Sequence, residues 1–179
     1  MRVRSALTAL ALVAGAAAGV AAAPAQAAAP TAPATSASPA APLVTKITHA
    51  QATSRFRSSG ITWSSSGGCS NRNNPTCTSF EQLNLASAQG AQTLKSASGC
   101  ALNITGGTET GHAGGTYSHW NGYKLDYSLA SCINNYVTGN FTYIGDRGDG
   151  AAQYRSGSGN IYARESNHWD VTYYNCGGC

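Results

Sequence analysis

The chain of 179 residues carries few charges, with 11 Lys and Arg against 7 Asp and Glu and a formal net charge of +4. It contains no run of basic residues, so the charge pattern typical of nucleic-acid-binding proteins is missing and we expect no nucleic-acid partner. Because there are only 7 acidic residues and 4 histidines, places where the two types recur at short spacing are informative about chemistry.

The first 28 residues have the pattern of a secretory signal peptide. Arg2 and Arg4 precede an uncharged, alanine-rich segment, residues 6–23, and an Ala-Gln-Ala cleavage pattern follows at residues 25–27. The alternative is an uncleaved membrane anchor, which the weak apolarity of alanine disfavours. We therefore expect a secreted, extracellular protein that has no membrane span after the signal peptide is cleaved.

Residues 29–42 are rich in Ala, Pro, Thr and Ser and carry no charge. Such a segment has little to bury and is typical of a disordered linker or pro-segment. Residues 43–179 then form the expected folded part, whose size suits one domain. We expect this domain to be a monomer.

The chain has 6 cysteines, and an even number in a secreted chain indicates disulfides. The spacing favours a bridge between Cys69 and Cys77, which would close a short loop. Cys176 and Cys179 also have the spacing of a redox pair. No helix follows them that could lower a thiol pKa, so a structural disulfide is favoured. We expect no free thiol in the secreted protein.

Helices are predicted first along the domain. Residues 48–59 have a helix-compatible composition, and Gly60 follows as a C-cap. Residues 78–81, Thr-Ser-Phe-Glu, match a capping box. An apolar stripe at helical spacing runs on from them until Gly99 ends the helix. A short third helix is predicted over residues 131–137.

Strands are predicted mainly in the second half of the domain, where aromatic and β-branched residues alternate with Gly, Asp and Ser turns. They cover residues 100–105, 124–129, 141–144, 151–155, 160–164 and 168–174. The fold class that we expect is α+β, with N-terminal helices packed on a small, disulfide-bonded antiparallel sheet.

The first candidate motif joins His119 to Asp126. Their spacing fits neither one face of a helix nor neighbouring positions of a strand. It fits a loop that turns at Gly122 and enters the strand over residues 124–129, so that Asp126 projects back towards His119. A single pair of this spacing is common in surface loops, and its meaning depends on the second motif.

The second motif contains Glu165 and His168. Residues three apart face opposite sides of a continuous strand, but Ser166-Asn167 is a turn-forming pair, so both side chains can point into one cleft. Asp170 shares a face with His168 and could orient its ring. Two imidazoles and one carboxylate as ligands, with a second carboxylate as general base, are what a catalytic zinc site needs.

Three further side chains are candidates for the wall of this cleft: His112, Trp120 and Tyr123. A loop histidine without a role is an equally good interpretation of His112, and core packing is the alternative for the aromatic residues. Residues 147–149 spell Arg-Gly-Asp, a cell-adhesion tripeptide, but their setting among glycines indicates a hairpin turn.

The order of His119, Gly122 and Asp126, followed at a distance by Glu165 and His168, resembles the M15 peptidase group. This group includes the zinc D-Ala-D-Ala carboxypeptidases and the L-Ala-D-Glu peptidases of endolysins. The resemblance implies a hedgehog/D-Ala-D-Ala-peptidase-like fold. It also implies that His119, Asp126 and His168 bind Zn²⁺ and that Glu165 is the general base. The implied substrate is a peptidoglycan stem peptide.

The resemblance covers roughly residues 100–174 and has one departure. The peptidases usually carry an arginine in the turn before the first metal ligand, where it holds the substrate carbonyl. Here residues 106–109 read Gly-Gly-Thr-Glu, without an arginine. The sequence therefore does not identify the residue that would stabilise an oxyanion.

We expect a secreted zinc-dependent peptidase that hydrolyses peptidoglycan stem peptides, as a carboxypeptidase or an endopeptidase. Two alternatives stay open. The hedgehog signalling domain uses a similar zinc site in a largely non-catalytic role, so a zinc-containing binding module is one of them. The missing arginine favours that module, and Glu165 favours the enzyme. The other alternative is a cell-wall carbohydrate-binding domain built on the aromatic, glycine-rich C-terminal half.

Overall fold

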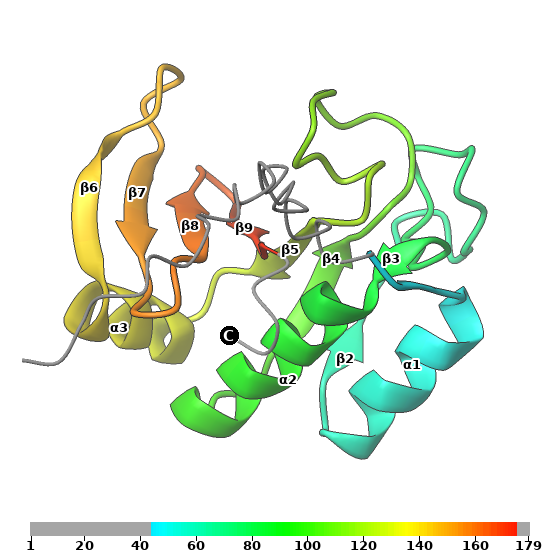
Figure 1. Cartoon of the computed structure of the whole chain (residues 1–179), viewed down its shortest axis with the longest axis horizontal. Helices are drawn as coiled ribbons and strands as arrows, with labels where there is room; N and C mark the ends of the chain where they lie inside the picture. The colour runs from blue at the N-terminus through cyan, green and yellow to red at the C-terminus, as the bar shows by residue number, and fades with distance from the viewer. Residues whose placement is uncertain (1–43, 175–179) are drawn as a thin grey trace, which may run out of the picture. The chain divides into compact units, whose positions relative to one another are not determined.

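The computed structural model describes residues 44–174 (Figure 1). The predicted signal peptide and linker and the Cys176–Cys179 pair lie outside these residues. The described helices are α1 (His49–Ser58), α2 (Leu85–Ser98) and α3 (Ser131–Asn140). The described strands are β1 (Lys46–Ile47), β2 (Thr62–Trp63), β3 (Leu83–Asn84), β4 (Asn103–Gly106), β5 (Lys124–Ser128), β6 (Thr142–Asp146), β7 (Ala152–Arg155), β8 (Ile161–Arg164) and β9 (His168–Thr172). The mixed α+β class is confirmed.

Helix α1 begins and ends close to where the sequence predicts. Thr48 and Gln51 form a capping box: the Gln51 N–H donates to Thr48 Oγ1 at 3.2 Å, and the Thr48 N–H donates to Gln51 Oε1 at 2.9 Å. Ser59 is the C-cap, and Gly60 follows it with a φ of +68°. A left-handed conformation of this kind is easiest for glycine.

The capping box predicted at residues 78–81 is wrong. Helix α2 begins only at Leu85, and the side chain of Asn84 before it makes no capping hydrogen bond. The Thr78 hydroxyl instead donates to two main-chain carbonyls of other segments, at 2.8 and 3.0 Å. A local pattern does not reveal such distant partners. The end of the helix at Gly99, where φ is +65°, is as predicted.

The large sheet has seven strands in the order β2-β4-β5-β9-β8-β7-β6, so the prediction of a small sheet is wrong. β2 and β4 are parallel, and the other neighbours are antiparallel. β1 and β3 form a separate two-stranded sheet. Strands of two residues, such as β2, are too short to show an alternating pattern. Helix α3 follows β5 in the chain, so the helices are not all N-terminal either.

The hydrophobic core includes one face of the central strands β5 and β9. Their register places Leu125 opposite Val171 and Tyr127 opposite Trp169, and all four side chains are fully buried. They belong to one cluster with side chains of α1 and α2, including Phe56. Because side chains alternate along a strand, the residues between them point to the opposite face, where the candidate site lies.

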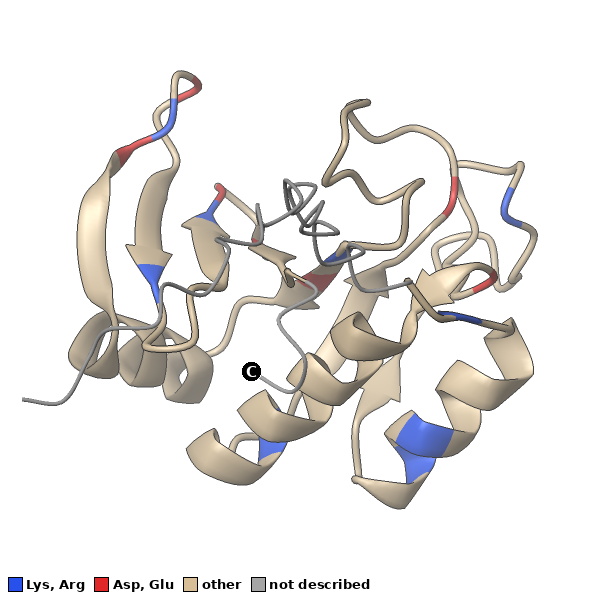
Figure 2. Ribbon diagram, viewed as in Figure 1, with Lys and Arg blue, Asp and Glu red and all other residues tan. Residues whose placement is uncertain are grey.

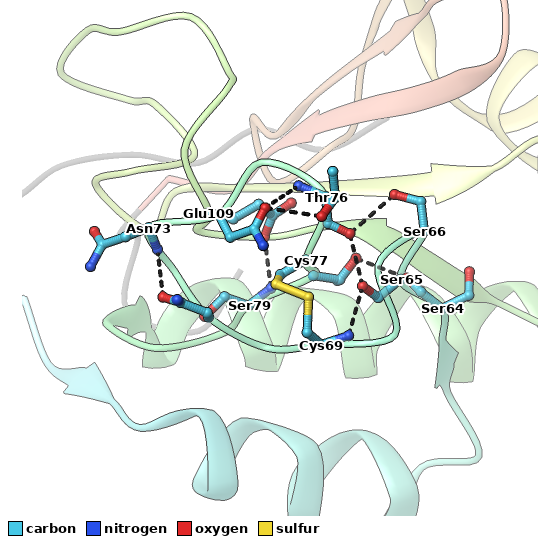
Figure 3. Close-up of a disulfide and its surroundings, with 12 residues drawn as sticks. Ser64, Ser65, Ser66, Cys69, Asn73, Thr76, Cys77, Ser79 and Glu109 are labelled. Atoms are coloured by element: carbon cyan, nitrogen blue, oxygen red, sulfur yellow. Dashed lines mark hydrogen bonds between the residues drawn. A yellow bond between two sulfur atoms is a disulfide. The ribbon is translucent and has the colours of Figure 1, made fainter.

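Two disulfides are present among the described residues. The predicted Cys69–Cys77 bridge is confirmed, and hydroxyl and main-chain hydrogen bonds surround it in a serine-rich loop (Figure 3). The second bridge joins Cys100, which precedes β4, to Cys132 in α3. Closing a loop of 32 residues is expected to stabilise the fold by about 3–4 kcal/mol in the chain-entropy treatment.

Both bridges are consistent with an extracellular protein. A pairing of Cys176 with Cys179 stays a prediction, because these residues lie outside the described part. Within residues 44–174, no helix combines the length and apolarity that crossing a bilayer requires.

Candidate metal centre

Two buried carboxylates face each other across β5 and β9. The register places Asp126 directly opposite Asp170, and these residues are 5% and 6% exposed. Like charges in this position are destabilising, and burial adds to the cost of each charge. One oxygen of each, Asp126 Oδ1 and Asp170 Oδ1, is buried without a hydrogen-bond partner. Both unsatisfied oxygens lie close to the same imidazole.

That imidazole belongs to His119, in the loop between β4 and β5. The loop turns where the predicted motif places the turn, with the Gly122 N–H donating to His119 O at 2.8 Å. His119 Nδ1 donates to Gly107 O at 2.7 Å, since a carbonyl can only accept. Nε2 then lies 3.2 Å from Asp126 Oδ1 and 3.6 Å from Asp170 Oδ1. A histidine held through one nitrogen with the other aimed at carboxylates has the arrangement of a metal ligand.

Gly122 has a steric role in this loop. Its φ is +76°, and a Cβ atom at this position would lie 2.5 Å from Gln82 O. Any larger residue would therefore push the loop away from β3 and displace His119 from the carboxylates.

His168 also lies near this oxygen of Asp126. Its Nδ1 lies 2.7 Å from Asn167 Oδ1, and its Nε2 lies 3.4 Å from Asp126 Oδ1. Ligand atoms 2.0–2.1 Å from a tetrahedral metal are about 3.3–3.4 Å apart. The separations of 3.2 and 3.4 Å from Asp126 Oδ1 to the two imidazoles match this value.

Glu165 stands beside His168, because the chain turns between β8 and β9. The Glu165 N–H donates to His168 O at 3.0 Å, which closes the predicted turn. Glu165 Oε2 consequently lies 3.5 Å from His168 Nε2. The structure thus brings together the four side chains that the two motifs contribute, His119, Asp126, Glu165 and His168.

His112 adds a second grouping around the same carboxylate. Its ring stacks on His119 with centroids 3.8 Å apart, and its Nδ1 lies 3.8 Å from Asp126 Oδ2. Among the described residues, the group whose ligand atoms all lie within 4.8 Å of one another, and which could hold a metal ion, is His112, His119 and Asp126, without the predicted His168. Sequence reasoning placed His112 only in the wall of a cleft.

Glu109 is a buried part of the site that sequence reasoning did not assign to it. The main-chain N–H groups of Ser79 and Gly107 donate to it at 2.7 and 3.0 Å, and its Oε1 lies 3.1 Å from His112 Nε2. Burial raises the pKa of this carboxyl, but these hydrogen bonds, with that of His112 foremost, lower it further than burial raises it. A signal was present, because Glu109 precedes His112 by three residues, just as Glu165 precedes His168.

Arg147 and Asp149 were also missed as members of the site. The Arg-Gly-Asp segment is a turn between β6 and β7, as predicted, and oppositely charged residues adjoin there (Figure 2). Arg147 Nη1 donates to Asp170 Oδ2 at 2.9 Å, and Nη2 donates to Asp149 Oδ2 at 2.6 Å and to Glu165 Oε1. Arg147 and Glu165 both line a cavity of about 540 Å³ that His119 and His168 also line.

Three residues, Trp120, Tyr123 and Asp170, have contacts other than those that the sequence predicts. Among the described residues, neither Trp120 nor Tyr123 lines this cavity, and the exposed Trp120 ring instead stacks with Arg72, whose guanidinium carbon is 3.6 Å from its centroid. Asp170 contacts Lys124 at 2.5 Å, as well as Arg147 and His119. The Nδ1 atom of His168, which Asp170 was expected to orient, is instead beside Asn167.

The charges of the site favour a cation. Burial lowers the pKa of His119, but the carboxylates of Asp126 and Asp170 beside its Nε2 outweigh burial and raise the pKa to about 10. Burial raises the pKa of Asp170, but His119 and Lys124 lower it well below its usual range. The metal-free site therefore holds a proton between two carboxylates, at the place where a metal ion would compete with it.

Comparison with protein-family models, with curated proteins and with solved structures finds no match to this chain.

Proposed function

We propose that the protein is a secreted zinc-dependent peptidase. The observation that carries this proposal is the convergence of two imidazole nitrogens, His119 Nε2 and His168 Nε2, on the unsatisfied, buried Asp126 Oδ1. Glu165 stands next to them with one oxygen facing His168. Two imidazole nitrogens and one carboxylate oxygen form a ligand set of the kind that zinc binds.

The proposal gives a role to each of four side chains. His119, Asp126 and His168 hold the zinc, which when bound polarises a carbonyl and lowers the pKa of water to about 7. The Gly107 carbonyl fixes the tautomer of His119 through Nδ1. Glu165 Oε2 accepts a proton from water and passes it to the departing amine.

The substrate class comes from the sequence resemblance rather than from the site. That resemblance suggests a peptidoglycan stem peptide, cleaved by a carboxypeptidase or an endopeptidase. The expected secretion and the two disulfides suit work outside the cell. The cavity beside the candidate metal site reaches solvent, since several of the side chains that line it are partly exposed, among them His112, Arg147 and Glu165.

A zinc-containing binding module is the second candidate. The ion pair between Arg147 and Glu165 favours it, because the guanidinium occupies one of the two oxygens that a general base would offer to water. Zinc analysis of the mature protein separates both candidates from a carbohydrate-binding domain without metal.

The test compares Glu165→Gln with the wild type on one preparation. Zinc content should stay at one per chain, while release of amino groups from purified peptidoglycan should fall about 10²–10⁴-fold, the usual contribution of a general base. Glu81→Gln is the matched control, since Glu81 lies against the His49 N–H in another part of the domain. If Glu165→Gln hydrolysed peptidoglycan at the wild-type rate, Glu165 would not be the general base. If the wild type did not hydrolyse peptidoglycan, the binding module would be the remaining candidate.

A further inference from the structure

The site offers more metal ligands than an open zinc centre can use. Glu165 Oε2 lies 3.5 Å from His168 Nε2, and Asp170 Oδ1 lies 3.6 Å from His119 Nε2. Each of these oxygens therefore lies close to one of the imidazoles that would bind the metal. If either carboxylate joined His119, Asp126 and His168, the metal would have four protein ligands. Such a closed centre is typical of structural zinc, whereas catalysis needs a vacant position.

Both competing carboxylates are held through their other oxygen by the same guanidinium. Arg147 donates through Nη2 to Glu165 Oε1 and through Nη1 to Asp170 Oδ2. Lys124 Nζ adds a second hold on Asp170 Oδ2, at 2.5 Å. Bonds between ionised partners are roughly twice as strong as neutral ones. Glu165, by contrast, pairs with no arginine or lysine other than Arg147 among the described contacts.

The β6–β7 turn fixes the position of this guanidinium. Arg147 Nε donates to Asp149 Oδ1 at 2.9 Å, and Nη2 donates to Asp149 Oδ2 at 2.6 Å. The main chain is closed by the Arg147 N–H, which donates to Ala151 O at 2.8 Å. These contacts within the Arg-Gly-Asp sequence direct its arginine towards the site.

We propose that Arg147 is a positioning residue that keeps the metal centre open by withholding Glu165 from the metal. The proposal rests on the metal-binding part of the proposed function. In this arrangement Glu165 Oε2 stays beside the metal without ligating it. Arg147 therefore decides whether Glu165 acts as a base or as a fourth ligand.

The experiment measures access of a neutral outside ligand to the metal. Cobalt(II) replaces zinc, and imidazole is titrated while the visible absorption of the cobalt is followed. A neutral probe is needed because removing Arg147 would weaken the binding of any anion by charge alone. Four proteins are compared: wild type, Arg147→Gln, Glu165→Gln and the double variant.

Wild type and Glu165→Gln should respond to imidazole alike. Arg147→Gln should bind cobalt but need at least 10-fold more imidazole, because Glu165 fills the vacant position. The double variant should regain the wild-type response, which a loss of structure would not do. Arg147→Lys keeps the charge but cannot donate to both carboxylates at once as the guanidinium does. The imidazole concentration that it needs should therefore lie between those of the wild type and Arg147→Gln. Arg147→Lys also provides the test if Arg147→Gln does not fold.

The matched control is Arg155→Gln, which removes an exposed arginine from β7 of the same hairpin and should behave as wild type. An unchanged imidazole response in both Arg147 variants would overturn the proposal. Failure of the double variant to regain the response would overturn it as well. A wild type that binds cobalt and imidazole but cleaves no peptide would contradict the peptidase and leave this role of Arg147 standing. If the wild type did not bind cobalt, both the zinc peptidase and this role of Arg147 would be ruled out.

Discussion

The two faces of the strand pair β5–β9 bury side chains of opposite kinds. One face carries Tyr127 opposite Trp169, fully buried against the core. The other carries Asp126 opposite Asp170, buried as well but with an oxygen of each lacking a hydrogen bond. The backbone pairing is common to both faces, so it does not cause the difference.

The difference shows that stability and chemistry are separated by the alternation of side chains along a strand. On the core face, apolar burial stabilises the sheet. On the site face, two opposed carboxylates weaken it, and the nearby cations His119, Lys124 and Arg147 offset that repulsion. A metal ion would offset it further. Changes on the two faces should therefore be distinguishable by what they alter.

The largest effect is expected on the core face. Trp169→Ala should lower the free energy of unfolding by about 3–5 kcal/mol, because it removes a fully buried ring and the hydrogen bond from Trp169 Nε1 to Asn134 Oδ1. His168→Ala, one position away on the other face, should cost less than about 1 kcal/mol in metal-free protein. Urea unfolding with a chelator measures both, and equal losses would contradict the separation of the faces.

A smaller effect is expected from metal removal. Free zinc at 100 times its dissociation constant should stabilise the wild type by about 2.7 kcal/mol, and a chelator should abolish the gain. Asp126→Asn should show no zinc-dependent shift of Tm, since its carboxylate is shared by every candidate ligand group. A zinc shift that persists in Asp126→Asn would place the metal elsewhere.

A further effect is a pH dependence confined to the site face. The pKa of His119 is raised to about 10 by Asp126 and Asp170 despite burial. Its stabilising contribution is therefore complete below about pH 6.5 and is lost as the pH rises through 10. Metal-free wild type should lose stability across this window in urea unfolding.

Two comparisons check this pH dependence. His119→Gln, which has no titrating ring, should show a flatter profile between pH 6.5 and 10. Zinc should flatten the wild-type profile too, because a bound metal replaces the proton on Nε2. A steep profile in His119→Gln would assign the titration to another group.

Much of the fold follows from local sequence. The position of α1, the end of α2 at Gly99 and the strands after Asn140 agree with their patterns to within a few residues. The two-residue strands β1, β2 and β3 could not be predicted, because pairing with distant segments defines them and no periodicity does.

The candidate site likewise contains residues that could be predicted from the sequence and residues that could not. His119, Asp126, Glu165 and His168 could be named because turns bring the members of each pair together locally, at Gly122 and at Ser166-Asn167. Arg147 could not, because its role depends on how the β6–β7 turn lies against β8 and β9. Glu109 could be recognised only by comparing its spacing to His112 with the equal spacing of Glu165 to His168.

The long chain separation within the central strand pair has a consequence for how the molecule acquires its metal. Lys124 and Asp170 meet although they are 46 positions apart, and α3 with strands β6 to β8 lies between them in the chain. The two halves of the ligand set can therefore meet only when this long segment closes into a loop, which has an entropic cost. Pairings of such separation form late and slowly. Metal capture would then be the last event of maturation, and the bound ion would lengthen the lifetime of the native state by slowing its unfolding rather than by speeding its formation.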